Sequence, residues 1–272
     1  MYKRQQLGYT IKEGNKETLL STEEKMVVRK RFGQHFLKDE NVIARIAKLV
    51  NVLPENNVIE IGPGHGAITD FLVSSGCHLR LIEIDKNLVL ELKQRFGKHI
   101  DILTGDALKL DYSKFGKSLR VIGNLPYNIS TPILFKLYKY VDQIEDMTFM
   151  LQKEVVDRLC ARCGTKNYGR LTIMTQYYCI AEKIFDVAPT SFSPKPRVHS
   201  AVVKLTPHKN PTQSQNLECL QNIVTGAFSQ RRKTIRNSLK PWLTEEELGS
   251  IGLDTSLRPQ ELSLNDYIKC AN

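Results

Sequence analysis

Long hydrophobic runs are missing from this chain of 272 residues. No stretch approaches the roughly 18 consecutive apolar residues of a membrane-spanning helix. The polar residues 1–16 also lack the apolar core of a secretory signal. We therefore expect a cytoplasmic protein without a membrane partner. The composition, 41% hydrophobic and 25% charged, is typical of a globular protein with a sizeable core.

Cysteine is sparse and irregularly spaced. The six cysteines include one CxxC pair, Cys160 and Cys163, but no second pair of ligands follows at zinc spacing. The pattern predicts reduced thiols, with neither a disulfide framework nor a metal site.

Acidic residues are scarce between Val187 and Trp242, where Glu218 is the only one. Nine basic residues occupy the same stretch: Lys195, Arg197, Lys204, Lys209, Arg231, Arg232, Lys233, Arg236 and Lys240. A second basic cluster, Arg29-Lys30-Arg31, lies near the N-terminus. Such an excess attracts a polyanion and makes binding salt-dependent. Solubility alone could explain it; anionic lipid is less favoured because neither stretch has an apolar face.

Strand and helix patterns alternate through most of the chain. Strands are predicted at 58–61, 79–84, 100–103, 119–122, 148–151 and 201–205, and helices at 41–50, 67–75, 87–96, 131–140 and 171–178. This order predicts an α/β fold, a Rossmann-like doubly wound sheet with helices on both faces. Residues 207–216 indicate a linker, and helices are predicted at 217–228, 233–239, 244–251 and 262–271.

The chain accordingly divides into three parts. We expect an N-terminal extension at 1–25, a catalytic domain at 26–207 and a small helical domain at 208–272. The N-terminal basic cluster and the first recognisable motif follow shortly after Met26, so we expect the functional chain to start there.

A glycine-rich turn, EIGPGHG at 60–66, follows the first predicted strand. Glycines such as Gly62 and Gly64 let the backbone approach a ligand closely, at a helix N-terminus. Glu83 ends the next strand, where a carboxylate can accept from ribose hydroxyls, and Asp106 follows the third, within reach of an adenine amine. The set resembles the class I S-adenosylmethionine (SAM) methyltransferases; GxGxG spacing makes NAD the lesser alternative.

The tetrapeptide Asn124-Leu125-Pro126-Tyr127 follows the fourth predicted strand, at the same crevice. An adenine amine is a poor nucleophile because its lone pair is delocalised into the ring. The Asn124 Oδ1 and the carbonyl of Leu125 or Pro126 could accept its two N–H groups and free that lone pair. Proline stiffens the turn, and Tyr127 offers a face for stacking. The alternative is a generic strand-to-helix turn.

The motifs together resemble those of the rRNA adenine dimethyltransferases, in particular the bacterial small-subunit members, from about residue 29 to the C-terminus. The matching segments are RFGQHFL at 31–37, EIGPG at 60–64, GNLPYNIS at 123–130, QKEV at 152–155, FSPKPRVHS at 192–200 and AFSQRRK at 227–233.

The resemblance implies a SAM site made by His35, Leu37, Gly62, Gly64, Glu83, Asp106 and Asn124. It also implies that Phe192 forms a second aromatic wall, holding the target base against Tyr127. The alternative for Phe192 is a buried core position.

The implied reaction is N6,N6-dimethylation of two adjacent adenosines near the 3′ end of 16S rRNA, within the 30S subunit or its precursor. We expect a monomer. The residues predicted to bind RNA are Arg29, Lys30, Arg31, Lys195, Arg197, Arg231, Arg232, Lys233 and Arg236.

Three alternatives share some of these features. A 23S rRNA adenine methyltransferase of the macrolide-resistance type has the same catalytic motifs. A non-catalytic RNA-binding assembly factor would not need all of Gly62, Glu83, Asp106 and Asn124. A DNA adenine methyltransferase would have no use for the basic C-terminal stretch.

Overall fold

The computed structural model of the protein describes residues 34–97, 100–209 and 214–272. The predicted extension at 1–25, the expected start at Met26 and the basic cluster at 29–31 lie outside this part of the chain. His35–Asn272 form one compact unit. The predicted division at 207 stays a prediction. None of the helices described is both long and apolar enough to cross a membrane.

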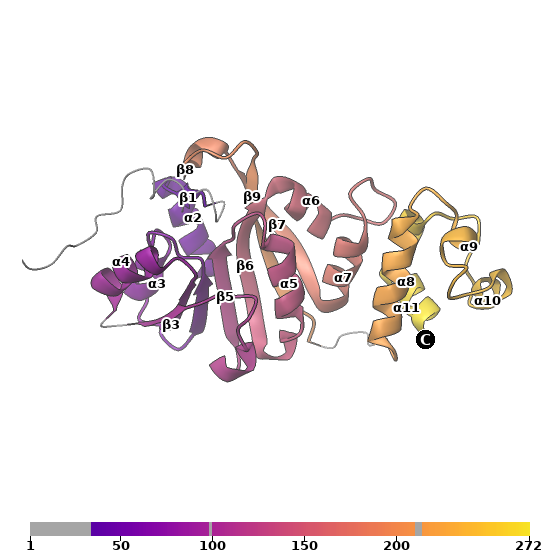
Figure 1. The fold of residues 1–272 in the computed structure, drawn as a ribbon, viewed down its shortest axis with the longest axis horizontal. Coiled ribbons are helices and arrows are strands. Elements are labelled where there is room, and N and C mark those ends of the chain that lie inside the picture. Colours follow the sequence, from indigo (N-terminus) through magenta and orange to yellow (C-terminus); the bar gives the residue numbers. More distant parts are fainter. Residues whose placement is uncertain (1–33, 98–99, 210–213) are drawn as a thin grey trace, which may run out of the picture. The chain divides into compact units, whose positions relative to one another are not determined.

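A seven-stranded sheet forms the centre of this unit (Figure 1). Its strands, in spatial order, are β4 (Asp101–Thr104), β3 (His78–Glu83), β2 (Asn57–Ile61), β5 (Leu119–Asn124), β6 (Ile144–Gln152), β9 (Ser200–Pro207) and β7 (Cys179–Val187). The strands β2 to β6 are parallel, whereas β9 is antiparallel to both of its neighbours. The chain runs outward from β2 to β4 and then returns to β5 on the other side of β2. The strand order thus reverses between β2 and β5, where α/β folds open a crevice.

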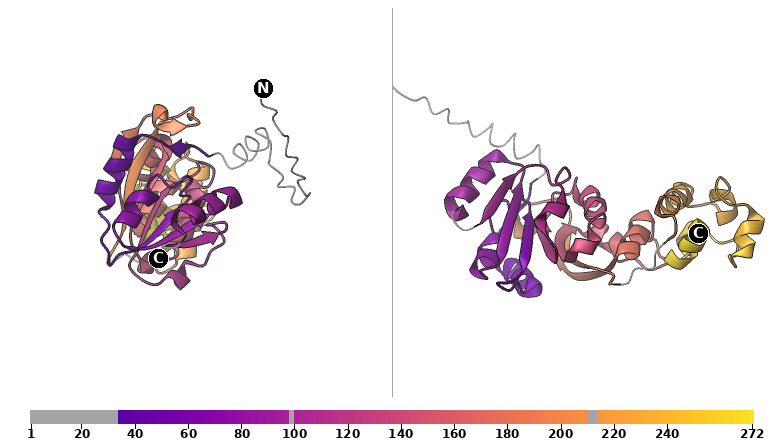
Figure 2. Two further views of the ribbon diagram at one scale, coloured as in Figure 1. Left: turned by 90° about the vertical axis from the view of Figure 1, so that its left-hand side faces the viewer. Right: turned by 90° about the horizontal axis from the view of Figure 1, so that it is seen from below.

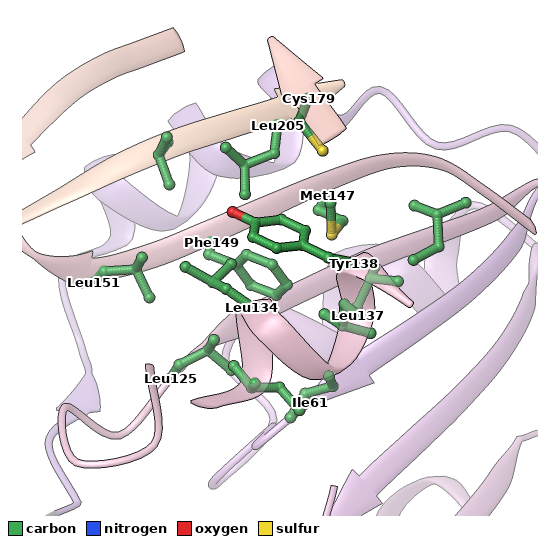
Figure 3. Close-up of a cluster of buried hydrophobic side chains, with 14 of the residues drawn as sticks. Ile61, Leu125, Leu134, Leu137, Tyr138, Met147, Phe149, Leu151, Cys179 and Leu205 are labelled. Carbon is green, nitrogen blue, oxygen red and sulfur yellow. The ribbon is translucent and has the colours of Figure 1, made fainter. Parts of the chain in front are cut away.

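Helices cover both faces of the sheet because the strands are apolar on both faces. Along β2, Val58 packs toward α2 (Glu40–Val50), α3 (Thr69–Ser74) and α4 (Lys86–Phe96). The next residue, Ile59, packs toward α5 (Ser130–Tyr138), α6 (Lys153–Leu159) and α7 (Arg170–Tyr178). Figure 3 shows this second cluster, which includes Leu125, Tyr138 and Phe149. The predicted doubly wound α/β fold is confirmed.

The C-terminal helices share a third buried cluster. They are α8 (Leu217–Ser229), α9 (Ile235–Ser238), α10 (Glu245–Ser250) and α11 (Leu264–Ala271). Ile173 and Tyr177 of α7 contribute to this cluster, so α7 joins the helical part to the sheet. Figure 2 shows the same succession from the sheet through α7 to the orange and yellow helices.

Short 3₁₀ segments complete the described elements, at Tyr112–Phe115, Val141–Gln143, Pro189–Ser191 and Pro259–Glu261. The predicted helix at 233–239 is shorter than expected, because residues 230–233 form a turn in which the Lys233 N–H donates to the Gln230 carbonyl.

Besides the 3₁₀ segments, three features were not predicted: one helix, one long strand and one small sheet. The helix α6 is short, and β7 lacks an apolar–polar alternation because Ile180 and Ile184 lie exposed on its outer face. The third is a two-stranded antiparallel sheet of β1 (Phe36–Leu37) and β8 (Phe192–Ser193), in which Leu37 faces Phe192. Two-residue strands carry no periodicity, so only their pairing defines them.

A buried ion pair joins neighbouring strands at the edge where the parallel strands begin. Arg120 of β5 donates to both carboxylate oxygens of Asp146 on β6, at 3.0 and 2.8 Å, and also to the Val50 carbonyl at 2.7 Å. Both side chains are buried, with 8% of Arg120 and 6% of Asp146 exposed. Removing one partner of such a pair leaves the other charge buried without compensation.

We predict that Asp146→Ala lowers the free energy of unfolding by about 3 kcal/mol or more, because the Arg120 guanidinium stays buried. Urea unfolding checks this. The control is Asp101→Ala, which removes the exposed partner of Arg80 at 3.6 Å and should cost under about 1 kcal/mol. Equal losses in the two variants would contradict a structural role for the buried pair.

Candidate functional site

The four predicted positions after parallel strands lie at one edge of the sheet, because parallel strands end together. Backbone hydrogen bonds tie the turns to one another. The Gly62 N–H donates to the Ile82 carbonyl at 2.9 Å, and the Gly105 N–H donates to the Glu83 carbonyl at 2.9 Å. The turn after β2 also lies near the end of β5, since a Cβ placed on Gly62 would be 3.7 Å from the Asn124 carbonyl oxygen. The structure thus brings Gly62, Glu83, Asp106 and Asn124 to the predicted crevice.

The glycine turn is closed on one side by β1. Gly62 and Gly64 have φ of 67° and 59°, in the left-handed region that favours glycine. A Cβ on Gly64 would lie 2.8 Å from the Phe36 ring, which is itself 4.3 Å from the His65 ring. Gly64 therefore needs to be glycine for its conformation and for the approach of Phe36.

Glu83 presents a buried carboxylate to this turn. Its Oε1 accepts from the N–H groups of Ile84 and Asp85 at 2.9 and 3.0 Å, and its Oε2 faces the Gly64 N–H at 3.4 Å. Burial raises the pKa of Glu83, and the three backbone donors oppose that rise. The two donors use both acceptor sites of Oε1, whereas Oε2 retains acceptor capacity for a hydroxyl group.

Ile84 is a residue that the sequence reasoning missed. Its side chain is 45% exposed although it directly follows Glu83, so it offers an apolar surface beside the carboxylate. The sequence signal that could have identified it is an isoleucine between two acids, Glu83 and Asp85, directly after an apolar strand.

Asp106 has one carboxylate oxygen engaged. Its Oδ1 accepts from the Leu108 N–H at 2.9 Å, which turns the chain after β4. Within the described ranges, Oδ2 has no hydrogen-bond partner and can accept from a ligand amine.

The Asn124 amide has a determined orientation. Its Nδ2 donates to the His35 carbonyl at 2.9 Å. A carbonyl accepts only, so the NH₂ end must face His35 and Oδ1 must face away. No hydrogen bond to that Oδ1 is formed by the residues that the structure describes. The side chain is therefore held as an outward acceptor.

The two backbone acceptors considered for the tetrapeptide differ. The Pro126 carbonyl accepts from the Ile129 N–H and from the Ser130 hydroxyl, both at 3.1 Å. The Leu125 carbonyl accepts no hydrogen bond from the described residues, and the buried Leu125 side chain anchors the turn in the core (Figure 3). Leu125 is thus the better second acceptor.

Tyr127 is half-buried and held at its polar end. Its hydroxyl shares a hydrogen bond with the Ser200 hydroxyl at 2.9 Å, and burial raises the pKa of the phenol. Its ring centroid lies 5.6 Å from that of His35, with the planes tilted by 34°. Ser200 comes from β9, far along the chain, and nothing in the sequence signals this contact.

Phe192 lies in the core in this structure. Only 2% of the residue is exposed, and it belongs to the cluster that contains Leu37 and Met150. Stacking a base on Phe192 would require the ring, or the residues that cover it, to move. Its pairing with Tyr127 stays a prediction, as does the role of Leu37, whose side chain is buried beside it.

The predicted RNA-binding residues fall into two groups. Arg231 donates to the Lys166 and Thr165 carbonyls at 2.7 and 3.3 Å, and Arg236 pairs with Glu245 at 3.2 Å. The exposed Lys195, Arg197, Arg232 and Lys233 form no ion pair with any residue that the structure places. Arg29, Lys30 and Arg31 lie outside the described residues.

The connection between α6 and α7, to which Arg231 donates, carries two further exposed basic residues. They are Arg162 and Lys166, which were not in the predicted set. Their distance in sequence from the basic stretch after Val187 explains why they were missed. Across the described ranges, no group of three or more His, Cys, Asp or Glu side chains could hold a metal ion.

Two solved structures are similar over most of the chain. A dimethyladenosine transferase from Plasmodium falciparum has a TM-score of 0.77 at 28% identity, covering 87% of this chain and 96% of that one. The 23S rRNA methyltransferase ErmE has a TM-score of 0.68 at 26% identity, covering 86% and 97%.

Sequence relatives are more similar. The Ribosomal RNA small subunit methyltransferase A of Methylococcus capsulatus is 50% identical over 246 residues, which are 89% of this chain and 96% of the relative. The protein of the same name from Pseudomonas fluorescens is 49% identical over 250 residues, covering 90% and 93%. The family model for ribosomal RNA adenine dimethylase matches residues 26–271. The chain therefore belongs to the ribosomal RNA adenine dimethylase family.

Proposed function

We propose that this protein transfers methyl groups from SAM to the N6 amines of two adjacent adenosines near the 3′ end of 16S rRNA. The substrate is the 30S subunit or its precursor, and four transfers complete the reaction. We propose that it acts as a monomer in the cytoplasm. The observation that carries the proposal is the orientation of the Asn124 amide, whose Nδ2 donates to the His35 carbonyl and whose Oδ1 is left as an acceptor, in a residue whose backbone lies near Gly62.

The residues at the crevice suit SAM. Glu83 would accept from the ribose hydroxyls, the apolar face of Ile84 would lie against the adenine ring, and Asp106 Oδ2 would accept from the adenine amine. The turn at Gly62 and Gly64 would admit the close approach of the ligand to the backbone. When bound, SAM supplies an electrophilic methyl group on a sulfonium.

The tetrapeptide would act on the target amine by position. The Asn124 Oδ1 and the Leu125 carbonyl would accept its N–H groups, which favours a pyramidal nitrogen with a free lone pair. Tyr127, held by Ser200, would stack on the target base. After attack the methylated amine loses its proton easily, so no general base is needed. Rate enhancement would come chiefly from alignment.

The choice of 16S rRNA rests on the relatives of about half identity, which carry the small-subunit name, against 26% identity to ErmE. The exposed Lys195, Arg197, Arg232 and Lys233 would contact rRNA phosphates. Arg231 and Arg236 would contribute less, because each already has an internal partner.

We predict that the protein with labelled SAM produces dimethyladenosine in under-methylated 30S subunits, measured by mass spectrometry of the rRNA. Naked 16S rRNA and 23S rRNA are tested in parallel. Asn124→Ala should lower transfer by about 100-fold or more, because a preorganised acceptor is lost, with a smaller effect on RNA binding. The exposed Asn41→Ala is the matched control. Label in 23S rRNA only would favour the macrolide-resistance activity, and RNA binding without any transfer would favour an assembly factor.

A pH dependence of stability follows from Glu60, at the end of β2. Burial raises the pKa of Glu60 to about 7 from 4.5, although a hydrogen bond from Thr69 at 2.6 Å opposes the shift. The folded state therefore binds the proton more tightly than the unfolded state. The resulting stabilisation is complete below pH 4.5 and is lost as pH rises through 7.

Glu60→Gln keeps an acceptor for Thr69 but cannot ionise. We predict that its free energy of unfolding, relative to that of the wild type, is higher at pH 8 than at pH 5 by about 2 to 3 kcal/mol. Urea unfolding at the two pH values measures the difference. The exposed Glu246→Gln is the control for loss of a carboxylate elsewhere. A constant difference between Glu60→Gln and the wild type would show that Glu60 does not titrate in this range.

We predict that the double variant Arg232→Gln/Lys233→Gln weakens binding to 30S subunits and reduces the slope of log affinity against log salt by about one to two. SAM affinity should be unchanged. The control is Lys114→Gln/Lys117→Gln, which removes the same amount of charge. These two exposed lysines lie just before β5, at the edge of the sheet opposite the crevice. Equal slopes in the two double variants would place the RNA elsewhere.

A further inference from the structure

The segment His35–Leu37 touches three parts of the site at once. Phe36 packs against Gly64 of the glycine turn, and the His35 carbonyl accepts from Asn124. On its other side β1 pairs with β8, and the Lys38 N–H donates to the Ser191 carbonyl at 2.9 Å. β1, which lies beside β8 in Figure 1, and the residue before it thus contact both the turn Asn124–Tyr127, here called the catalytic turn, and the β8 segment.

The His35 side chain makes a separate contact with that segment. Its Nδ1 lies 2.7 Å from the Pro194 carbonyl oxygen. Because a carbonyl can only accept, Nδ1 must carry the hydrogen. The imidazole points its donor toward Pro194, while its ring lies beside Tyr127 at 5.6 Å.

We propose that His35 is a positioning residue for the target base, joining the Pro194 segment to the catalytic turn. This inference rests on the proposed function. One residue holds Asn124 with its carbonyl and Pro194 with its imidazole, although these partners are 70 positions apart in the chain. The imidazole thereby adds a side-chain link to the β1–β8 pairing, at Pro194, the residue directly after β8. The resemblance instead implied that His35 holds SAM, so the two roles make different predictions.

The test compares His35→Ala, His35→Asn and the control His78→Ala, an exposed histidine at the start of β3. Alanine removes the donor but keeps the backbone carbonyl for Asn124. The asparagine NH₂ can donate from nearly the same place as Nδ1. SAM affinity is measured by calorimetry, and kcat and KM are measured with under-methylated 30S subunits.

We expect His35→Ala to raise the KM for the subunit roughly five- to tenfold, the effect of one lost hydrogen bond, with SAM affinity unchanged within about twofold. His35→Asn should restore the KM to within about twofold of the wild-type value. The control His78→Ala should have the wild-type KM. Weaker SAM binding with an unchanged KM would instead assign the imidazole to the cofactor. An unchanged KM in His35→Ala, or a loss that asparagine does not rescue, would also overturn the proposal.

Hydrogen exchange in the RNA-free protein separates this inference from the proposed function. In His35→Ala the amides at 191–193 should exchange at least about threefold faster, because the segment loses its side-chain link. Unchanged exchange would refute the link whatever the activity. If exchange is faster but the wild-type protein methylates no rRNA, the proposed function is overturned, and the role of His35 toward a target base is overturned with it. Only the hydrogen bond between His35 and Pro194 would then remain supported.

Discussion

The hydrogen bond from the Asn124 amide to the His35 carbonyl is the interaction on which the site depends. It joins the last residue of β5 to the residue just before β1, a two-residue strand that precedes the seven-stranded sheet in the chain. Without it, nothing among the described residues would distinguish the two ends of the amide. With it, the Nδ2 end is committed to His35 and Oδ1 is left as the acceptor before any substrate arrives, so an amine bound there would need no reorganisation of this amide.

The same edge of the sheet concentrates buried carboxylates. Glu60 and Glu83 lie at the C-terminal ends of neighbouring strands, as the next-to-last and last residue, and burial raises the pKa of both. Their ionised forms are disfavoured in the ligand-free protein and would be stabilised by a cationic ligand. The buried pair of Arg120 and Asp146 lies at the other edge, where strands begin, and is fully compensated.

Charge in the sequence and charge available for binding are different quantities. The basic stretch predicts a polyanion partner, yet Arg231 donates to two carbonyls and Arg236 is paired with an acid. Both residues help to hold the C-terminal helices and the α6–α7 connection in place. Arg162 and Lys166 become available beside them.

Local patterns in the sequence determined the doubly wound fold, the glycine turn and the positions of Glu83, Asp106 and Asn124, because each follows a strand with its own periodicity. Parallel strands end at one edge, so these residues could be predicted to meet. Only the tertiary structure decided the pairing of β1 with β8, the contact of Ser200 with Tyr127, the burial of Phe192 and the direction of the Asn124 amide. Each of these depends on residues distant in the chain, and no local preference specifies which distant partner a side chain meets.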